Sequence, residues 1–163
     1  VKQDFRRPRR IPALMAYAYD LCSLFGKVVI SEDRQACALL LFPEKKKTTL
    51  KSLVLDFKLI VTCIGISQVI RVLRREAMLR KARPRERMYY LWFIGVAPAR
   101  QHDGSGSRLL ESILRDSRRD QRPVYLETST LRNLPWYGKF GFEAYHEIDM
   151  GYRLSFLRRP VRN

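Results

Sequence analysis

The segment from Tyr90 to Leu110 contains the residue types and the spacing that can hold a phosphate group. Its apolar first part ends at Val96, a turn follows, and Gly104 and Gly106 stand where a helix is expected to begin. Glycines let a backbone approach a ligand closely, and the unpaired N–H groups at a helix start favour an anion. The segment lacks the Gly-Lys-Ser/Thr of a P-loop and a full dinucleotide fingerprint. It predicts an anion site or, alternatively, a tight strand-to-helix turn.

Hydrophobic periodicity predicts the elements that must position this segment. Helices are expected at residues 12–25, from Thr48 or Thr49 to about Lys81 with an interruption near Gly65, at 109–117 and at 135–140. Strands are expected at residues 28–30, 36–42, 88–96, 124–128, 142–148 and 151–157, with the first two and the last two as hairpins. This order predicts a mixed α/β domain.

Length and charge limit the possible classes of protein. A chain of 163 residues with 46% hydrophobic residues fits one globular domain with its own core. The 32 Lys and Arg residues against 16 Asp and Glu residues give a formal charge of +16. Such a charge favours a nucleic acid, an anionic membrane or a phosphorylated cofactor, without choosing among them.

The cysteines and the most apolar stretch bear on compartment and membrane. Cys22, Cys37 and Cys63 lack the spacing of a disulfide framework or a zinc site, which favours a reducing cytoplasm and no metal. Residues 1–10 lack the apolar run of a signal peptide. The stretch 52–67 carries charges and is too short to span a membrane, so we expect a buried helix there and no membrane partner.

A basic run from Arg71 to Arg87 supports a different interpretation, a nucleic-acid-binding module. Arg71, Arg74 and Arg75 share one helical face and could follow a phosphate backbone. The same run is typical of a solvated helix face in a basic protein. We favour the solvated face and expect no specific nucleic-acid partner.

Two blocks of the chain resemble a known family. Residues 101–106, Gln-His-Asp-Gly-Ser-Gly after Val-x-Pro, resemble the acetyl-CoA motif Gln/Arg-x-x-Gly-x-Gly/Ala of the GCN5-related N-acetyltransferase (GNAT) superfamily. The block from Tyr125 to Phe142 resembles that family's strand followed by an Asn, an Ala or Pro, a Tyr and a Gly-Phe pair. Its Leu-Glu-Thr-Ser and Arg-Asn-Leu-Pro segments are similar to the small-molecule branch that includes puromycin N-acetyltransferase.

The resemblance implies a fold and a cofactor. The fold is a mixed, mostly antiparallel sheet splayed around the arm of acetyl-CoA and flanked by helices. It would form a single domain, residues 1–163, that lacks or abbreviates the family's first strand and helix. The backbone of Ile94, Gly95 and Val96 would bind pantetheine, and Asn133 would contact that arm or a bridging water. The residues that would surround the pyrophosphate are Gln101, His102, Asp103, Gly104, Ser105, Gly106 and Ser107.

The family's reaction assigns roles to a few side chains. Acetyl transfer to an amine needs a neutral amine, stabilisation of an oxyanion and a proton for the thiolate. Tyr137 is the general-acid candidate near the sulfur, because a phenol with a pKa of about 10 stays protonated; the alternative is a core tyrosine. The N–H of Val96 would meet the oxyanion. Glu127 is the candidate base, or else the partner of an arginine, and strand alternation places it on the face of Tyr125.

The acceptor is predicted only as a class. The aromatic residues Tyr89, Tyr90 and Trp92 favour a compact, partly apolar amine, and the enzyme would be a monomer or a homodimer. A protein N-acetyltransferase is the alternative within the family. Asp103 lies beside the expected pyrophosphate, so the resemblance also implies that affinity for CoA is lowered without being abolished.

Overall fold

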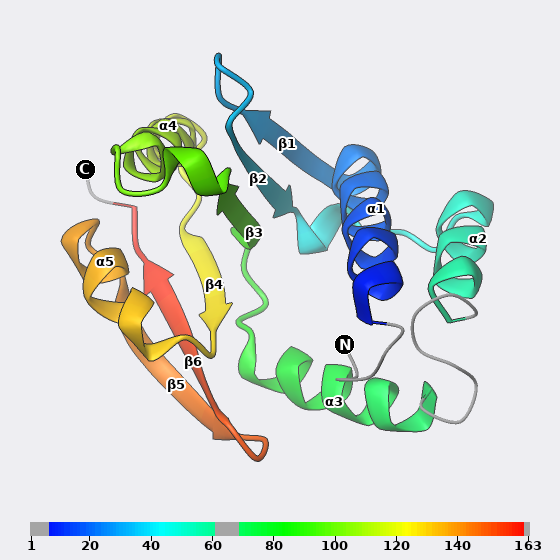
Figure 1. Ribbon diagram of the computed structural model, residues 1–163. Coiled ribbons are helices and arrows are strands. Elements are labelled where there is room, and N and C mark those ends of the chain that lie inside the picture. The colour runs from blue at the N-terminus through cyan, green and yellow to red at the C-terminus, as the bar shows by residue number, and fades with distance from the viewer. Residues whose placement is uncertain (1–6, 61–68, 162–163) are drawn as a thin grey trace.

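The computed structural model describes residues 7–60 and 69–161. They form one 6-stranded sheet with helices on both of its faces (Figure 1). In chain order the helices and strands are α1 (Arg7–Phe25), β1 (Gly26–Ile30), β2 (Ala36–Leu41), α2 (Leu50–Leu59), α3 (Val69–Ala82), β3 (Tyr89–Val96), α4 (Ser105–Arg119), β4 (Val124–Thr128), α5 (Leu134–Lys139), β5 (Glu143–Asp149) and β6 (Arg153–Arg159). The predicted mixed α/β order and both hairpins are confirmed, and β4 has the predicted bounds.

The sheet opens between β3 and β4. Its strand order is β1-β2-β3-β4-β6-β5, and β3 and β4 run parallel while the other neighbouring strands run antiparallel. The described ladder joins β3 to β4 only at Tyr89–Val124 and Tyr90–Tyr125. Beyond these pairs, β3 continues along β2 to Val96, whereas β4 continues along β6. A mostly antiparallel sheet that separates at its centre was the expected fold.

A β-bulge in β3 changes which side chains share a face. Leu39 pairs with Phe93 and Leu40 with Leu91, so that Trp92 has no partner of its own on β2. Because a bulge inserts one residue into the alternation, Trp92 and Phe93 both pack on the same side. Their ring centroids lie 5.5 Å apart.

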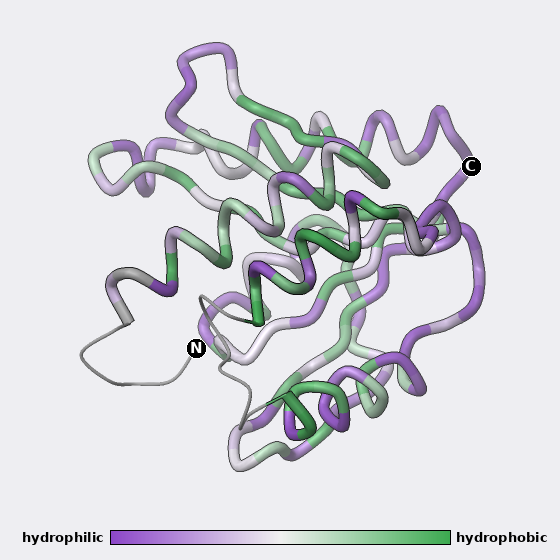
Figure 2. The backbone as a smooth tube through the Cα atoms, turned by 90° about the vertical axis from the view of Figure 1, so that its right-hand side faces the viewer, coloured by the Kyte–Doolittle hydropathy of each residue, from purple (hydrophilic) through white to green (hydrophobic). Residues whose placement is uncertain are grey.

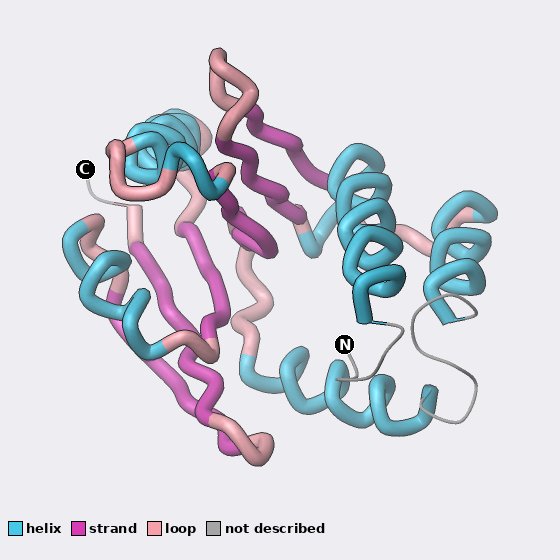
Figure 3. The backbone as a smooth tube through the Cα atoms, in the orientation of Figure 1, coloured by secondary structure: helices cyan, strands magenta, loops and turns pink. Residues whose placement is uncertain are grey.

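Two layers of side chains cover the two faces of the sheet. On one face, α4 and α5 pack on a cluster that includes Tyr89, Leu91 and Leu126. On the other face, α1 packs on a cluster that includes Tyr90 and Tyr125, and α3 contacts the β5–β6 hairpin (Figure 3). Figure 2 shows hydrophobic stretches through the centre of the molecule and hydrophilic residues in the turns around it.

The prediction of a buried helix over residues 52–67 is wrong for its described part. Thr49 caps α2 through a capping box with Ser52. It is one of the two residues, Thr48 or Thr49, at which the helix was expected to begin. Several apolar side chains along α2 are nevertheless exposed, whereas Leu55 and Leu59 are half-buried; the exposed ones are Leu50, Leu53, Val54 and Phe57. Periodicity identifies an apolar stripe, but it does not say whether another element covers it. The break expected near Gly65 lies outside the described residues.

Three smaller points concern the ends of elements, the cysteines and the membrane. α1 begins at Arg7, earlier than expected, and contains Pro12. Cys22 and Cys37 are free thiols, and Cys63 lies outside the described residues. Within the ranges that the structure describes, we find no helix that combines the length and the apolar character needed to cross a bilayer.

Candidate active site

The turn after β3 brings the backbone into the conformation that an anion site needs. His102 has φ +67°, and Gly104, directly before α4, has φ +86° in the left-handed region. Such angles are easy for glycine and strained for other residues. The turn therefore ends directly at α4, whose first N–H groups, beginning at Ser105, have no acceptor within the helix itself.

Asp103 already supplies a negative charge at this helix start. Its Oδ1 accepts a hydrogen bond from the N–H of Ser105 at 2.8 Å, and its Oδ2 lies 3.0 Å from Nε of Arg100. The hydrogen bonds from Ser105, with smaller contributions from Arg100 and Arg108, hold the pKa of the Asp103 carboxyl below its usual value. One of the expected phosphate donors is thus paired with the chain's own carboxylate.

Two arginines beside the turn were missed by sequence reasoning. Arg108 donates from Nη2 to Oγ of Ser105 at 2.9 Å and from Nη1 to the carbonyl of Asp103 at 3.3 Å. Arg100 lies on the other side of Asp103. Both are partly or largely exposed cations within reach of the turn. For Arg108 the spacing from Gly104 was a usable signal, since a residue four positions on along a helix returns to the same face.

The end of β3, the start of α4 and α5 meet at one place. A Cβ on Gly106 would lie 3.3 Å from Cγ2 of Val96 and 3.8 Å from the ring of Trp136. Trp136 also donates from Nε1 to Oγ of Ser107 at 3.4 Å. Ile94, Val96 and Trp136 pack against the same core cluster. Val96, Gly106 and Ser107, three of the residues expected to bind the cofactor, therefore lie close to one another or to Trp136.

Tyr137 and Asn133 lie beside this meeting point on α5 and just before it. The Tyr137 ring is almost fully buried. Its centroid lies 4.8 Å from the ring centroid of Trp136 and 5.5 Å from that of Phe142. Burial raises the pKa of Tyr137 to about 12, so the phenol is protonated at neutral pH. No hydrogen bond joins its hydroxyl to another group in the described chain. Asn133 is half-buried and its side chain makes no capping bond to α5.

Glu127 is paired with an arginine, the second of the two roles expected for it. Its Oε1 accepts a hydrogen bond from Nε of Arg83 at 2.6 Å, and the Glu127 side chain is 10% exposed. Arg83 also donates to the hydroxyl of Tyr90 at 3.0 Å and to Glu76 at 3.1 Å, and its guanidinium lies 4.5 Å from the centroid of the Tyr90 ring. This side chain connects β3 to β4 where the strands separate.

The position of Arg83 corrects part of the expectation for the basic run. Arg71, Arg74 and Arg75 are exposed on α3, as a solvated face requires. Arg83, however, turns inward, and its side chain is 19% exposed. In the sequence nothing separates it from its exposed neighbours, because its partner Glu127 lies far along the chain.

A pocket of about 470 Å³ lies on this face of the sheet, between α1, α2, α3 and β3. Tyr90, Trp92 and Arg83 line it, and Tyr17 lines it from α1. The third aromatic residue expected here, Tyr89, points to the opposite face, where its hydroxyl contacts Asp120. Because side chains alternate along β3, Tyr89 and Tyr90 point to opposite faces of the sheet. The aromatic residues that line the pocket are therefore Tyr90, Trp92 and Tyr17, and Tyr89 is not among them.

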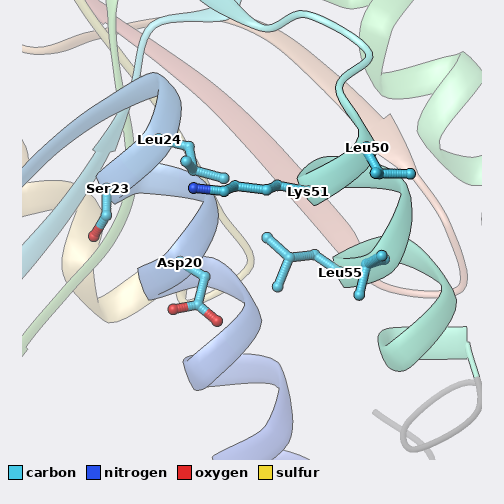
Figure 4. A pocket seen from close by; sticks show the side chains of 7 residues that line it. Asp20, Ser23, Leu24, Leu50, Lys51 and Leu55 are labelled. Carbon is cyan, nitrogen blue, oxygen red and sulfur yellow. The ribbon is translucent and has the colours of Figure 1, made fainter.

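A second hollow, of about 490 Å³, lies on the outside of the molecule between α1 and α2 (Figure 4). Leu24, Leu50 and Leu55 form its apolar walls, and the side chain of Lys51 extends from α2 toward α1. The described residues that line it all come from these two helices. It therefore has no connection to the strands that separate.

Known proteins match this chain in sequence and in fold. The model of the acetyltransferase (GNAT) family matches residues 60–142. An uncharacterized N-acetyltransferase of Schizosaccharomyces pombe is 39% identical over 54 residues, which are 33% of this chain and 22% of that protein. The match thus spans less than a quarter of the length of that curated relative.

Solved structures share the fold over most of the chain. A crystal structure of histone acetyltransferase HPA2 and related acetyltransferase from Corynebacterium glutamicum covers 100% of this chain and 80% of that one, with TM-score 0.66 and 16% identity. The ribosomal-protein-S18-alanine N-acetyltransferase from Escherichia coli covers 94% of this chain and 88% of that one, with TM-score 0.51 and 13% identity. At these identities the likeness establishes the fold alone.

Proposed function

We propose that this chain, which belongs to the acetyltransferase (GNAT) family, is an N-acetyltransferase that moves the acetyl group of acetyl-CoA directly to an amine of a small molecule. The observation that carries this proposal is the opening between β3 and β4 beside the glycine-initiated start of α4 (Figure 1). Enzymes of this family use acetyl-CoA, which supplies an activated acetyl thioester.

The residues around the opening fit such a cofactor. After Tyr90, the edge of β3 that faces β4 has no ladder partner among the described residues, so the backbone of Ile94, Gly95 and Val96 is available to the pantetheine arm. Residues 101–107 surround the start of α4 and would hold the diphosphate through N–H groups. Arg100 and Arg108 add positive charge there. Asn133 would contact the arm from the other side.

Tyr137 is proposed as the general acid. When the amine nitrogen forms its bond to the acetyl carbon, the bond from that carbon to sulfur breaks and the leaving sulfur takes up a proton. The Tyr137 hydroxyl can give this proton, because burial keeps it protonated at neutral pH and no described group occupies it. The N–H of Val96 would donate to the acetyl oxygen as negative charge develops on it.

Glu127 is proposed to receive the proton that the amine loses, directly or through water. Its carboxylate lies at the end of β4, on the pocket side of the opening. Arg83 holds this carboxylate in one orientation and compensates its charge. Both expected roles of Glu127 are compatible, since a carboxylate can accept from Arg83 and still accept from a second donor.

A small-molecule amine is favoured over a protein as the acceptor. The pocket beside Glu127 is closed in by three helices and lined by the rings of Tyr17, Tyr90 and Trp92. Its volume is within the usual range for small-molecule sites, about 300–1,000 Å³.

We also propose that the enzyme works in a reducing compartment, the cytoplasm, since Cys22 and Cys37 are free thiols.

Calorimetry and a thiol-release assay test this proposal together. Acetyl-CoA and CoA should bind in the micromolar range, and acetyl-CoA should release free thiol faster when a suitable amine from a panel is present. Peptides with a free amino terminus serve as the comparison set. Absence of CoA binding would contradict the cofactor site, and faster turnover with peptides than with every small amine would contradict the acceptor class.

A further inference from the structure

An exposed apolar stripe runs along α2. Four large side chains at positions i, i+3, i+4 and i+7 share one face of this helix, and we call them the α2 stripe: Leu50, Leu53, Val54 and Phe57. They are between 52% and 81% exposed. The helix itself packs on α1, where Asp56 accepts a hydrogen bond from Tyr17. The α2 stripe therefore lies on the side of α2 that the described chain leaves largely uncovered.

The α2 stripe forms a ridge on the outside of the molecule. Figure 1 shows α2 beyond α1, on the side away from the sheet. Leu53 and Phe57 line neither the hollow between α1 and α2 nor the pocket beside β3. These two side chains therefore stand out from the surface, where a small ligand would contact them on one side only.

The surroundings of the α2 stripe are positively charged. The segment 44–60 carries two carboxylates and five exposed lysines: Lys45, Lys46, Lys47, Lys51 and Lys58. Both carboxylates are already engaged within the chain, since Glu44 accepts from Arg122 at 2.7 Å and Asp56 accepts from Tyr17 at 2.7 Å. The partner that fits this surface is therefore both apolar and anionic.

The lysines border the α2 stripe in a way that suits a flat anionic surface. Lys51 and Lys58 are seven residues apart, so they lie on one side of the helix, beside the stripe. Lys47 precedes the first turn. An apolar helix face edged by lysines is typical of a helix that lies in a membrane surface, with its apolar side chains about 5–10 Å deep and its cations at the headgroups.

Other partners fit the α2 stripe less well. A second copy of the chain would bring its own lysines against those of the first, and like charges repel. A nucleic acid offers phosphates to the lysines but no apolar layer for Leu53 and Phe57. An acidic protein matches the charge but needs a groove shaped to the ridge, whereas a lipid surface yields around it. The sequence-based expectation of no membrane partner came from a buried helix, and the exposure of α2 removes that ground.

We propose that the α2 stripe and its lysines bind the surface of an anionic phospholipid membrane. Leu53 and Phe57 enter the boundary between headgroups and acyl chains, while Lys47 and Lys51 meet the anionic headgroups. The 10 residues of α2 are too few to cross a bilayer, so the helix lies in the plane of the surface. This binding is separate from acetyl transfer, because neither the opening between β3 and β4 nor the start of α4 takes part in it.

Co-sedimentation with lipid vesicles tests the proposal. The complete chain would be mixed with vesicles of phosphatidylcholine alone or of phosphatidylcholine with about 30% phosphatidylglycerol, at about 0.15 M salt. One lysine near an anionic surface strengthens binding about fivefold, so the anionic vesicles should bind the chain at least about tenfold more tightly. Equal binding to both vesicles would overturn the proposal. Absence of binding to either would overturn it in favour of an acidic protein as the partner.

A matched pair of substitutions tests the apolar contribution. Leu53 and Ile30 are 52% and 55% exposed, but Ile30 lies at the end of β1, away from α2. Leu53→Ser should weaken binding to the anionic vesicles about fivefold or more, because it removes apolar surface that the lipid would cover. Ile30→Ser should leave binding unchanged, and melting temperature checks that both variants fold. Undiminished binding of Leu53→Ser would show attraction by charge alone and overturn the proposal.

A second matched pair tests the lysines at constant total charge. Lys47→Gln with Lys51→Gln, and Arg115→Gln with Arg118→Gln, each remove two positive charges. The two arginines are exposed on α4, which packs on the opposite face of the sheet from α1. The lysine pair should weaken binding to anionic vesicles about tenfold or more, and the arginine pair less than about twofold. Equal losses would show that only total charge matters and would overturn the placement on α2.

Analytical ultracentrifugation without lipid tests a second copy as the occupant. The sedimentation coefficient of the chain should be the same with and without the Leu53→Ser substitution. A dimer that dissociates on Leu53→Ser would assign the α2 stripe to a second copy and overturn the membrane proposal.

Discussion

The two sides of the sheet build their sites by different means. On the α4 side, the proposed cofactor site comes from backbone: a left-handed Gly104, a helix start and the edge of β3 that, past Tyr90, has no ladder partner on β4 among the described residues. On the α1 side, it comes from side chains that are distant in sequence. Tyr17 reaches Asp56 across 39 positions, and Arg83 reaches Glu127 across 44.

This difference separates what the two sides can recognise. A backbone site presents N–H groups of fixed geometry, which suits a diphosphate that is the same for every enzyme of the family. A side-chain pocket can change residue by residue, which suits an acceptor that differs between enzymes. Substitutions on one side should therefore leave binding on the other side unchanged.

The largest effect is expected for Tyr137→Phe, on the α4 side of the sheet. Removing the phenolic proton should lower kcat roughly 100-fold, while CoA and amine affinities stay the same. Because burial raises the pKa of Tyr137 to about 12, its acid form persists below that pH, and its contribution is lost only as pH rises through 12. Steady-state kinetics with calorimetry checks this. Unchanged turnover would identify Tyr137 as a core residue.

The second-largest effect is expected for CoA binding at the start of α4. Gly104→Val places a β-branched residue at φ +86° and a Cβ 3.2 Å from Nη1 of Arg108. The left-handed conformation costs an L-residue about 1–2 kcal/mol, so CoA affinity should fall by roughly tenfold or more. Gly138→Ala, where a Cβ meets open space, is the control. If amine binding fell equally, the two sides would not be independent.

Arg83→Met tests the side-chain-built side. It leaves the Glu127 carboxylate without its compensating cation, which should lower stability by about 1–3 kcal/mol. The value of kcat/KM for the amine should fall about tenfold, with CoA affinity held within twofold. Adding Glu127→Gln should restore melting temperature but not turnover. Recovery of turnover in the double variant would make the pair structural only.

The smallest effect is expected for Asp103→Asn, and it has the opposite sign. Asn can still accept from Ser105 but carries no charge beside the diphosphate, so CoA should bind about two- to fivefold more tightly. Contacts in the folded chain lower the pKa of Asp103. These contacts therefore stabilise the fold at pH values above the pKa of Asp103 in the unfolded chain. The stabilisation is lost as pH falls through the lower pKa of the folded chain. Weaker CoA binding in the variant would show that the loop needs this carboxylate.

The contrast between the sides also explains what the sequence could predict. Gly104, the strand 124–128 and the place of Tyr137 follow from local patterns, because turns, strands and helix starts leave residue signatures. Arg83 could not be distinguished within its basic run, since its inward orientation depends on a partner on another strand. The exposed apolar residues of α2 were missed for the same reason. Their helical spacing can be read from the local sequence, but whether another element packs on them depends on residues far along the chain.

Mass spectrometry of the reaction with carbon-13-labelled acetyl-CoA and 4-phenylbutylamine tests the central claim most directly. The account predicts that the amine gains one labelled acetyl group for each CoA thiol released, and that the Tyr137→Phe enzyme forms this product far more slowly. Labelled acetate without labelled amide, across the whole amine panel, would contradict the assignment of the pocket as the acceptor site of an N-acetyltransferase.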